Sequence, residues 1–305
     1  MTDRLMLLDT ASLYFRAFYG VPDTVKAPDG RSVNAARGLL DMIAKLVTTY
    51  EPTHVVACWD DDWRPQWRVD LIPSYKAHRV VEVVAGAPDV EEVPDPLETQ
   101  IPVIRAELEA IGIPIVGVAA HEADDVIASF AAQASAPVDV VTGDRDLFQL
   151  VDDERGVRVI YTGKGMSNLE VLDEAAVVSK YAVLPAQYAD FAALRGDASD
   201  GLPGVAGIGE KIAASLLKEH GDLAGVRAAA ASGTGMTAGV RAKILAASDY
   251  LDVAPTVVEV VRTLDLPAVS ARLRAPEATA VSAVAERWGL GASLDRAVTA
   301  ISSRA

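Results

Sequence analysis

Residues 138–146 read Val-Asp-Val-Val-Thr-Gly-Asp-Arg-Asp (VDVVTGDRD), a short apolar run that ends in acidic residues. The run has the length of a buried strand, and the glycine that follows it is a turn former. Two earlier segments have the same pattern, RLMLLD at residues 4–9 and HVVACWD at residues 54–60. Strand-length apolar runs that end in an acid are therefore a repeated feature of this sequence.

Helical segments separate these runs. A fourth strand-length run spans residues 113–118, and helical periodicity is present at residues 33–50, 97–111 and 124–134. Strands that alternate with helices predict a parallel sheet covered by helices on both faces. Ligands of such sheets bind at the carboxyl ends of the strands. We therefore predict an α/β fold in which the acids that end the runs, Asp9, Asp60, Asp144 and Asp146, meet at one edge of the sheet.

The fourth run leads into a helix with three acids at its start. The segment His121-Glu-Ala-Asp-Asp125 places Glu122 and Asp125 three residues apart, on one face of the first turn. Acids at a helix N-terminus are favoured by the helix dipole, so capping is the alternative role for them. Beside the other strand-end acids, Glu122, Asp124 and Asp125 are candidates for the same site.

Composition limits the classes of protein and of metal site. The chain has 305 residues, 50% hydrophobic and 23% charged, which indicates one large globular domain or one with a small satellite. No apolar stretch is long enough to span a membrane and residues 1–10 lack a secretory signal, so we expect a cytoplasmic protein without membrane association. Cys58 is the only cysteine, and the four histidines show no zinc-binding spacing. A metal site in this chain must therefore use oxygen ligands.

The net charge of −15 argues against a nucleic-acid partner unless the acids have a local function. Two carboxylates about 4 Å apart repel by on the order of 4 kcal/mol at an effective dielectric near 20, so a cluster of acids needs protons or cations. Hard oxygen ligands favour Mg²⁺ or Mn²⁺, which bind phosphate as well. Two such ions would activate water and stabilise the leaving oxygen of a phosphodiester.

Two further segments stand out. Residues 63–79 carry a net charge of +3 and residues 80–100 a net charge of −6, with three prolines, which indicates a protruding, mobile insertion between a strand and the next helix.

After residue 172 the chain is helical and Ala-rich, and the glycine-rich segment 196–211 marks tight turns between helices. Its spacing fails both the dinucleotide-binding and the P-loop patterns. We expect residues 228–237 to form a flexible loop.

These motifs together resemble the bacterial flap endonuclease / 5′→3′ exonuclease family, which also supplies the N-terminal domain of DNA polymerase I. The resemblance rests on LLDT at Asp9, CWD at Asp60, HEADD at residues 121–125, TGDRD at residues 142–146 and GDASDGLPGVAGIGEK at residues 196–211. It implies a PIN-like 5′-nuclease fold in a stand-alone form. The implied parts are a nuclease core over residues 1–184 with a helical arch at 63–97, a helix-two-turn-helix region at 185–250, and a C-terminal helical region at 251–305 that packs on the core.

The resemblance also implies which acids bind metal ions. The implied ligands of the first ion or its waters are Asp9, Glu122, Asp124, Asp125 and Asp144, with Asp60 close by. The implied second-ion group is Asp146, Asp197 and Asp200. The family commonly has Asn after the second aspartate of GDxSDN, whereas this chain has Gly201, which is expected to loosen the turn that positions Asp200.

DNA contacts are implied in the same way. Lys76 and Arg79, at the base of the arch, would contact the scissile phosphate, and Arg16 is another basic position near the active site. Tyr75 could stack on an unpaired base. The turn with Gly204, Gly207, Gly209 and Lys211 resembles the element whose backbone N–H groups bind duplex phosphates, often with a bound K⁺.

The sequence thus predicts a monomeric Mg²⁺- or Mn²⁺-dependent nuclease of replication and repair that cuts the 5′ strand of DNA. Its expected substrates carry 5′ flaps, nicks or recessed ends, with RNA–DNA hybrids as further candidates. A PIN-like metal-dependent ribonuclease would share the sheet and the acids but predicts a shorter chain without the arch. A catalytically silent DNA-binding scaffold is the third alternative, and nine clustered acids with no metal ion to bind argue against it.

Overall fold

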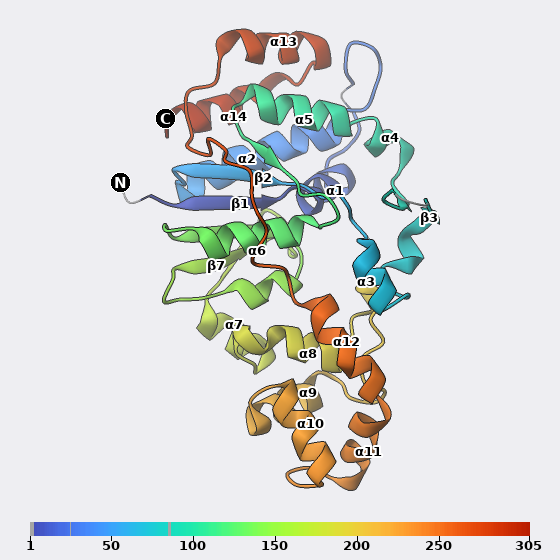
Figure 1. Cartoon of the computed structure of the whole chain (residues 1–305). Helices are drawn as coiled ribbons and strands as arrows, with labels where there is room; N and C mark the ends of the chain where they lie inside the picture. Colours follow the sequence, from blue (N-terminus) through green and yellow to red (C-terminus); the bar gives the residue numbers. More distant parts are fainter. Residues whose placement is uncertain (1–2, 25, 85–86) are drawn as a thin grey trace.

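A six-stranded sheet forms the centre of the molecule (Figure 1). The computed structural model describes residues 3–24, 26–84 and 87–305. In spatial order the strands are β5 (Ile115–Val116), β2 (His54–Cys58), β1 (Leu5–Asp9), β6 (Val138–Thr142), β7 (Val157–Tyr161) and β8 (Glu170–Leu172). Neighbouring strands are parallel except β7 and β8, which are antiparallel. The predicted α/β fold with a mainly parallel sheet is confirmed.

Helices cover both faces of the sheet because successive strand residues point in opposite directions. In β1, Leu7 packs into the core on one face, and Met6 and Leu8 pack into the core on the other. The Met6 face is covered by α1 (Thr10–Gly20), α2 (Asn34–Tyr50), α5 (Ile101–Ala110), α13 (Ala278–Trp288) and α14 (Gly291–Ser302). The Leu7 face is covered by α6 (Ala123–Gln133), α7 (Glu174–Tyr181) and α8 (Tyr188–Arg195). Burial on both faces explains the continuous apolar strands.

A helical lobe lies at the end of the molecule away from α13 and α14 (Figure 1). Its helices are α9 (Glu210–His220), α10 (Leu223–Ser232), α11 (Ala238–Ala246) and α12 (Ser248–Val258). The expectation of a flexible loop over residues 228–237 is wrong for its first half, because the alanine run continues α10 until Gly233 adopts a left-handed conformation, φ +78°. Within the part of the chain that the structure describes, no helix is both long and apolar enough to cross a membrane.

The chain returns from this lobe to the core by an extended segment. Val55 donates a backbone hydrogen bond to Ala271 (2.9 Å) and Leu273 donates one to Thr53 (2.9 Å), so residues 271–273 lie beside β2. The segment ends at α13 and α14, and α14 packs along α2 (Figure 1). Of the predicted C-terminal region, α13 and α14 pack on the core, whereas α12 packs against α8 and the insertion.

The insertion between β2 and α5 differs from the expected helical arch. Its elements are α3 (Gln66–Leu71), a 3₁₀ turn (Ala77–Arg79), strands β3 (Val80–Glu82) and β4 (Val90–Glu91), and α4 (Asp95–Glu98). The valines of this segment favour the antiparallel β3–β4 pair over a helix. Ala85 and Gly86, which fall within the predicted arch, lie outside the described residues.

Candidate active site

Acids gather at the carboxyl edge of the sheet. Asp9 ends β1, Asp60 follows β2 and Asp144 follows β6, and β1 lies between the other two strands. A cleft of about 310 Å³ opens at this edge. The acids that line the cleft are Asp9, Asp60, Glu91, Glu122, Asp124 and Asp144. The expectation that strand-end acids share one site therefore holds for Asp9, Asp60 and Asp144, which come from three different strands.

Hydrogen bonds fix the acids of the cleft. Asp9 accepts from the Thr142 hydroxyl (2.6 Å) and, as N-cap of α1, from the Ser12 backbone N–H (3.1 Å). Asp60 accepts from the backbone N–H of Ala123 (2.9 Å), so it is tied to the first residue of α6.

Burial raises the pKa of Asp9 to about 7, in spite of the Thr142 hydrogen bond, and the Asp60 charge adds to the rise. Burial also raises the pKa of Asp124 well above its ordinary value, with Asp144 as the next cause.

A second group of acids adjoins the first. Asp146 starts a 3₁₀ turn after β6. Asp197 is the N-cap of another 3₁₀ turn, which ends at Asp200. Burial raises the pKa of Asp146 well above its ordinary value, and the charges of Asp144, Asp200 and Asp197 raise it further. Burial raises the pKa of Asp200 to about 6. These acids therefore lie close enough to repel one another.

The chemistry of the donor set fits divalent cations. Asp146 Oδ1 is buried and has no hydrogen-bond partner among the residues that the structure describes, which is costly for a carboxylate oxygen. All the candidate ligands are hard oxygen donors, as Mg²⁺ and Mn²⁺ prefer. Within residues 3–24, 26–84 and 87–305, however, no three acids or other potential ligands are arranged so that they could hold an ion without side-chain movement. Binding would therefore require side chains of the site to move.

Lys76 and Arg79 enter the cleft from the insertion and pair with its acids. The Lys76 ammonium donates to Glu122, and Arg79 donates to Asp200 Oδ1 (3.4 Å) and to the Ser199 carbonyl (3.0 Å). Burial alone would lower the pKa of Lys76, but the Glu122 carboxylate raises it well above its ordinary value. Lys76 therefore stays charged, and both side chains line the cleft.

Gly201 tightens the contact between the insertion and the Asp200 turn. It adopts φ +69°, and a Cβ atom there would lie 2.0 Å from the Ser74 carbonyl oxygen. Ser74 Oγ donates to the Gly201 carbonyl (2.7 Å), and the Lys76 backbone N–H donates to the Asp200 backbone carbonyl (2.9 Å). The expectation that Gly201 loosens this turn is wrong, because the missing side chain lets the two backbones meet.

Two of the expected site residues have other contacts. Tyr75 is 5% exposed and its hydroxyl donates to Glu122 Oε2 (2.7 Å), so its ring is not free to stack on a base as predicted. Asp125 is fully buried and forms a bidentate ion pair with Arg68 (2.7 and 2.9 Å). This geometry does not support the expectation that Asp125 binds a metal ion. Sequence reasoning missed Arg68, whose only signal was its place in the basic stretch 63–79.

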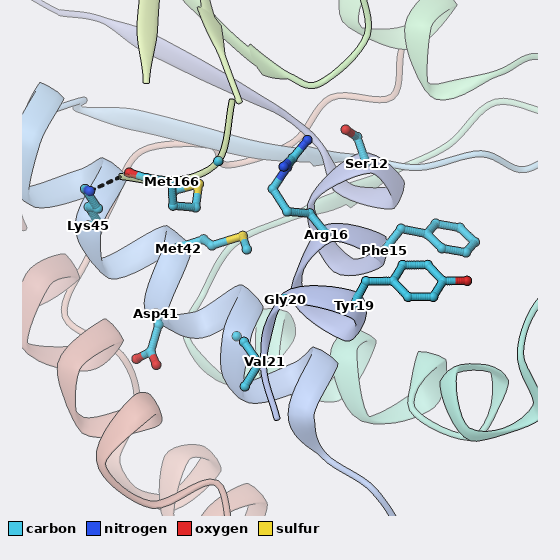
Figure 2. A pocket seen from close by; sticks show the side chains of 12 residues that line it. Ser12, Phe15, Arg16, Tyr19, Gly20, Val21, Asp41, Met42, Lys45 and Met166 are labelled. Atoms are coloured by element: carbon cyan, nitrogen blue, oxygen red, sulfur yellow. Dashed lines mark hydrogen bonds between the residues drawn. The ribbon is translucent and has the colours of Figure 1, made fainter. Parts of the chain in front are cut away.

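Arg16 lies on α1 in a groove of about 810 Å³ next to the cleft (Figure 2). Ser12 and Phe15 line both the groove and the cleft, so the two are neighbours. Figure 2 shows Met42 of α2 and Met166 between Arg16 and Lys45, and Lys45 donates to the Met166 carbonyl (2.5 Å). Arg16 is therefore placed beside the cleft and does not line it.

The glycine-rich turn precedes α9 in the helical lobe. Gly209 is the N-cap of α9, whose first backbone N–H groups have no partner within the helix, and Lys211 is exposed in its first turn. Gly204 packs against Gly196, so a Cβ atom there would lie 2.5 Å from the Gly196 nitrogen. Lys243 of α11 donates to the Gly207 carbonyl (2.9 Å). The turn is thus held against both the Asp197 loop and α11.

Two protein-family models together match residues 4–280 of the chain. Residues 4–182 match the family described as 5′-3′ exonuclease, N-terminal resolvase-like domain, and residues 183–280 match 5′-3′ exonuclease, C-terminal SAM fold. A 5′-3′ exonuclease of Streptomyces coelicolor is 59% identical over 98% of this chain and 100% of its own length. One of Mycobacterium tuberculosis is 47% identical over 97% of both chains. DNA polymerase I of Mycobacterium bovis is 44% identical over 71% of this chain, which is 23% of that protein.

Solved structures resemble the whole fold. The T5 D15 protein, co-crystallised with metal ions, has a TM-score of 0.66 and 18% identity, covering 98% of each chain. The catalytic core of Rad2, in complex with a DNA substrate, has a TM-score of 0.61 and 16% identity, covering 100% of this chain and 93% of that one. Because these sequence identities are below 20%, the comparison shows a similar fold only.

Proposed function

Because the chain belongs to the 5′-3′ exonuclease family, we propose that its cleft hydrolyses phosphodiester bonds near the 5′ ends of DNA strands at flaps, nicks and recessed ends. As a member of this family the chain is a nuclease that acts on DNA. The observation that supports the proposal most strongly is the meeting of Asp9, Asp60 and Asp124 with Lys76 and Arg79 in one cleft.

These carboxylates are suitable ligands for Mg²⁺ or Mn²⁺, and such ions would balance their negative charge. We assign Asp9, Asp60, Asp124 and Asp144 to one ion, with Glu122 as a partner of the waters of that ion, and Asp146, Asp197 and Asp200 to another. When bound, such ions activate a water molecule and stabilise charge on the phosphate and the leaving oxygen. Burial raises the pKa values of Asp9 and Asp200 to about 7 and about 6, and a cation bound nearby would favour their ionised forms.

Lys76 and Arg79 would bind the scissile phosphate. In the free protein Lys76 donates to Glu122 and Arg79 donates to Asp200, so both side chains are already held by acids beside the proposed reaction site. A phosphate that enters with its cations would replace those carboxylates as the partner of the two side chains. Donors held in place before the reaction stabilise a developing negative charge without reorganisation. The expected products are a 5′-phosphate and a 3′-hydroxyl.

The helical lobe would bind the duplex beside the cleft. Backbone N–H groups at the start of α9, with Lys211, can bind phosphates irrespective of base sequence. We propose K⁺ as a further ligand of the Gly204–Gly209 turn, although Lys243 already donates to the Gly207 carbonyl there. Because amide groups supply much of this contact, the affinity for DNA should depend only modestly on salt.

The test is product sizing on 5′-labelled flap, nicked, gapped and single-stranded RNA substrates, in Mg²⁺, Mn²⁺ and EDTA. The proposal expects short 5′ products from branched DNA that disappear with EDTA and with Asp60→Asn. Asp61→Asn is the matched control, since Asp61 is the exposed neighbour of Asp60. Equal cleavage of single-stranded RNA would favour the ribonuclease alternative, and binding of flaps without cleavage would favour the silent scaffold.

A further inference from the structure

The guanidinium group of Arg68 connects three segments of the chain. Arg68 comes from α3 at the base of the insertion and is 2% exposed. Its Nη1 donates to Glu122 Oε2 (2.6 Å) and to Asp125 Oδ2 (2.9 Å), and its Nη2 donates to Asp125 Oδ1 (2.7 Å). Its Nε donates to the Val257 carbonyl (3.1 Å) at the end of α12. The group therefore joins the insertion to α6 and to α12.

Asp125 has no acceptor site left for another ligand. Oδ1 accepts from Arg68 and from the Val261 backbone N–H (2.8 Å), and Oδ2 accepts from Arg68 and from the Glu122 backbone N–H (3.3 Å). A carboxylate offers about four lone-pair sites, and these four hydrogen bonds fill them. A metal ion at Asp125 would have to break a buried bidentate ion pair and leave Arg68 without that partner.

Glu122 is held by the residues around Asp125. Arg68 and the Tyr75 hydroxyl (2.7 Å) both donate to its Oε2, whereas Oε1 has the Lys76 ammonium as partner. Its backbone N–H is fixed by Asp125. Glu122 and Lys76 both line the cleft, while Asp125 and Arg68 do not. Glu122 Oε1 is therefore the atom through which this network contacts Lys76, the residue that we expect to touch substrate.

The charges in this network balance. Arg68 and Lys76 carry two positive charges, and Glu122 and Asp125 carry two negative charges. The negative charges of Glu122 and Asp125 are thus balanced by cations of the protein itself. External cations would therefore balance the charges of the remaining acids at the carboxyl edge of the sheet.

We propose that Arg68 and Asp125 are positioning residues: their buried ion pair holds Glu122 against Lys76, so that the insertion and α6 meet in a fixed register at the cleft. Asp125 then contributes to catalysis through Glu122 and not as a metal ligand. This inference rests on the proposed nuclease function for its effect on turnover, but the contacts that it assigns to Asp125 can be tested without turnover.

The experiment compares Asp125→Asn with Asp124→Asn, the adjacent acid that lines the cleft. Mn²⁺ binding is titrated by electron paramagnetic resonance, and kcat and KM are measured on a flap at saturating Mg²⁺. For Asp125→Asn we expect Mn²⁺ affinity within about threefold of wild type and a kcat about 10- to 100-fold lower with KM little changed, as for residues that orient a ligand. For Asp124→Asn we expect Mn²⁺ affinity to fall at least about tenfold. A loss of Mn²⁺ affinity in Asp125→Asn equal to that in Asp124→Asn would overturn the proposal.

Arg68→Lys gives a second test, because lysine keeps the charge but cannot form the bidentate pair. We expect a loss of kcat similar to that of Asp125→Asn, again with wild-type Mn²⁺ affinity and a cooperative thermal transition. An unchanged kcat in a folded Arg68→Lys protein would refute the positioning role. If wild type cuts no DNA, the proposed function fails, and the Mn²⁺ titration of Asp125→Asn still decides whether Asp125 is a metal ligand.

Discussion

The Lys76 ammonium donates a hydrogen bond to Glu122, so the base of the insertion is tied to the N-terminus of α6 by an ion pair inside the cleft. The pair joins residues that are 46 positions apart in the chain. Lys76 also adopts a left-handed backbone conformation, φ 47°, which is uncommon for a residue with a side chain. Its side chain is therefore held at the cleft before any substrate arrives.

Replacing Lys76 should affect turnover more than binding. We expect Lys76→Met to lower kcat by roughly 100-fold, because it removes a donor aimed at the reacting phosphate, with KM within a few-fold of wild type. Steady-state kinetics on a labelled flap measure both constants. Lys180→Met, which removes an exposed lysine of α7, is the control. A large rise in KM with unchanged kcat would show that Lys76 serves only to bind DNA.

The close approach at Gly201 predicts a position that does not tolerate a side chain. We expect Gly201→Asn to lower stability by about 1–3 kcal/mol, because the added Cβ meets the Ser74 carbonyl. It should also lower kcat by displacing Asp200 from Lys76. Gly112→Asn is the matched control, since Gly112 also has a positive φ, +77°, but open space around its Cβ. Equal denaturation midpoints for the two variants would contradict this account.

Glu107 should make the core less stable at high pH. It is fully buried on α5, and neither carboxylate oxygen has a partner in the described part of the chain. Burial raises its pKa well above the ordinary value. The folded state thus keeps a proton that the unfolded state releases, so this contribution to stability is lost as pH rises from the ordinary carboxyl range toward the raised pKa.

We expect Glu107→Met to raise the unfolding free energy at pH 8 by about 1–3 kcal/mol and to reduce its decline with pH. Urea denaturation at several pH values measures both effects. Glu109→Met, at an exposed position on the same helix, should do neither. A lower stability of Glu107→Met at pH 8 would imply that the carboxylate has a favourable partner.

The sequence predicted the parts of the fold that depend on local pattern. The runs that became β1, β2 and β6 are apolar throughout because helices cover both faces, and the acids at their ends follow from the parallel direction of the strands. Strand β7 was missed because Arg158 interrupts its apolar pattern, and β8 because it has only three residues.

The roles of Tyr75 and Asp125 could not be read from the sequence. Both depend on contacts across the fold: Arg68 lies 57 positions before Asp125, and Glu122 lies 47 positions after Tyr75. Motif spacing gives no information on such partners. The shape of the insertion was missed for a different reason, since its valines stabilise a strand pair where the family resemblance implied helices.

Divalent cations should stabilise the protein most at neutral to high pH. Asp9 and Asp200 have pKa values raised to about 7 and about 6, so the folded state binds more protons than the unfolded state, and stability in EDTA should fall as pH rises from 4 to 7. At pH 8, saturating Mg²⁺ should restore roughly 5 °C or more of Tm by mass action. Differential scanning calorimetry tests this, with K⁺ at equal ionic strength as the control. A Tm that is indifferent to Mg²⁺ at pH 8 would argue against the metal site.

The most direct measurement is the anomalous difference map of a crystal soaked in Mn²⁺. We expect one peak within ligand distance of Asp9, Asp124 or Asp144 and a second near Asp146 and Asp200, with Asp125 still paired to Arg68. Wild-type crystals without any anomalous peak at the carboxyl edge of the sheet, at a Mn²⁺ concentration that supports cleavage in solution, would contradict the account.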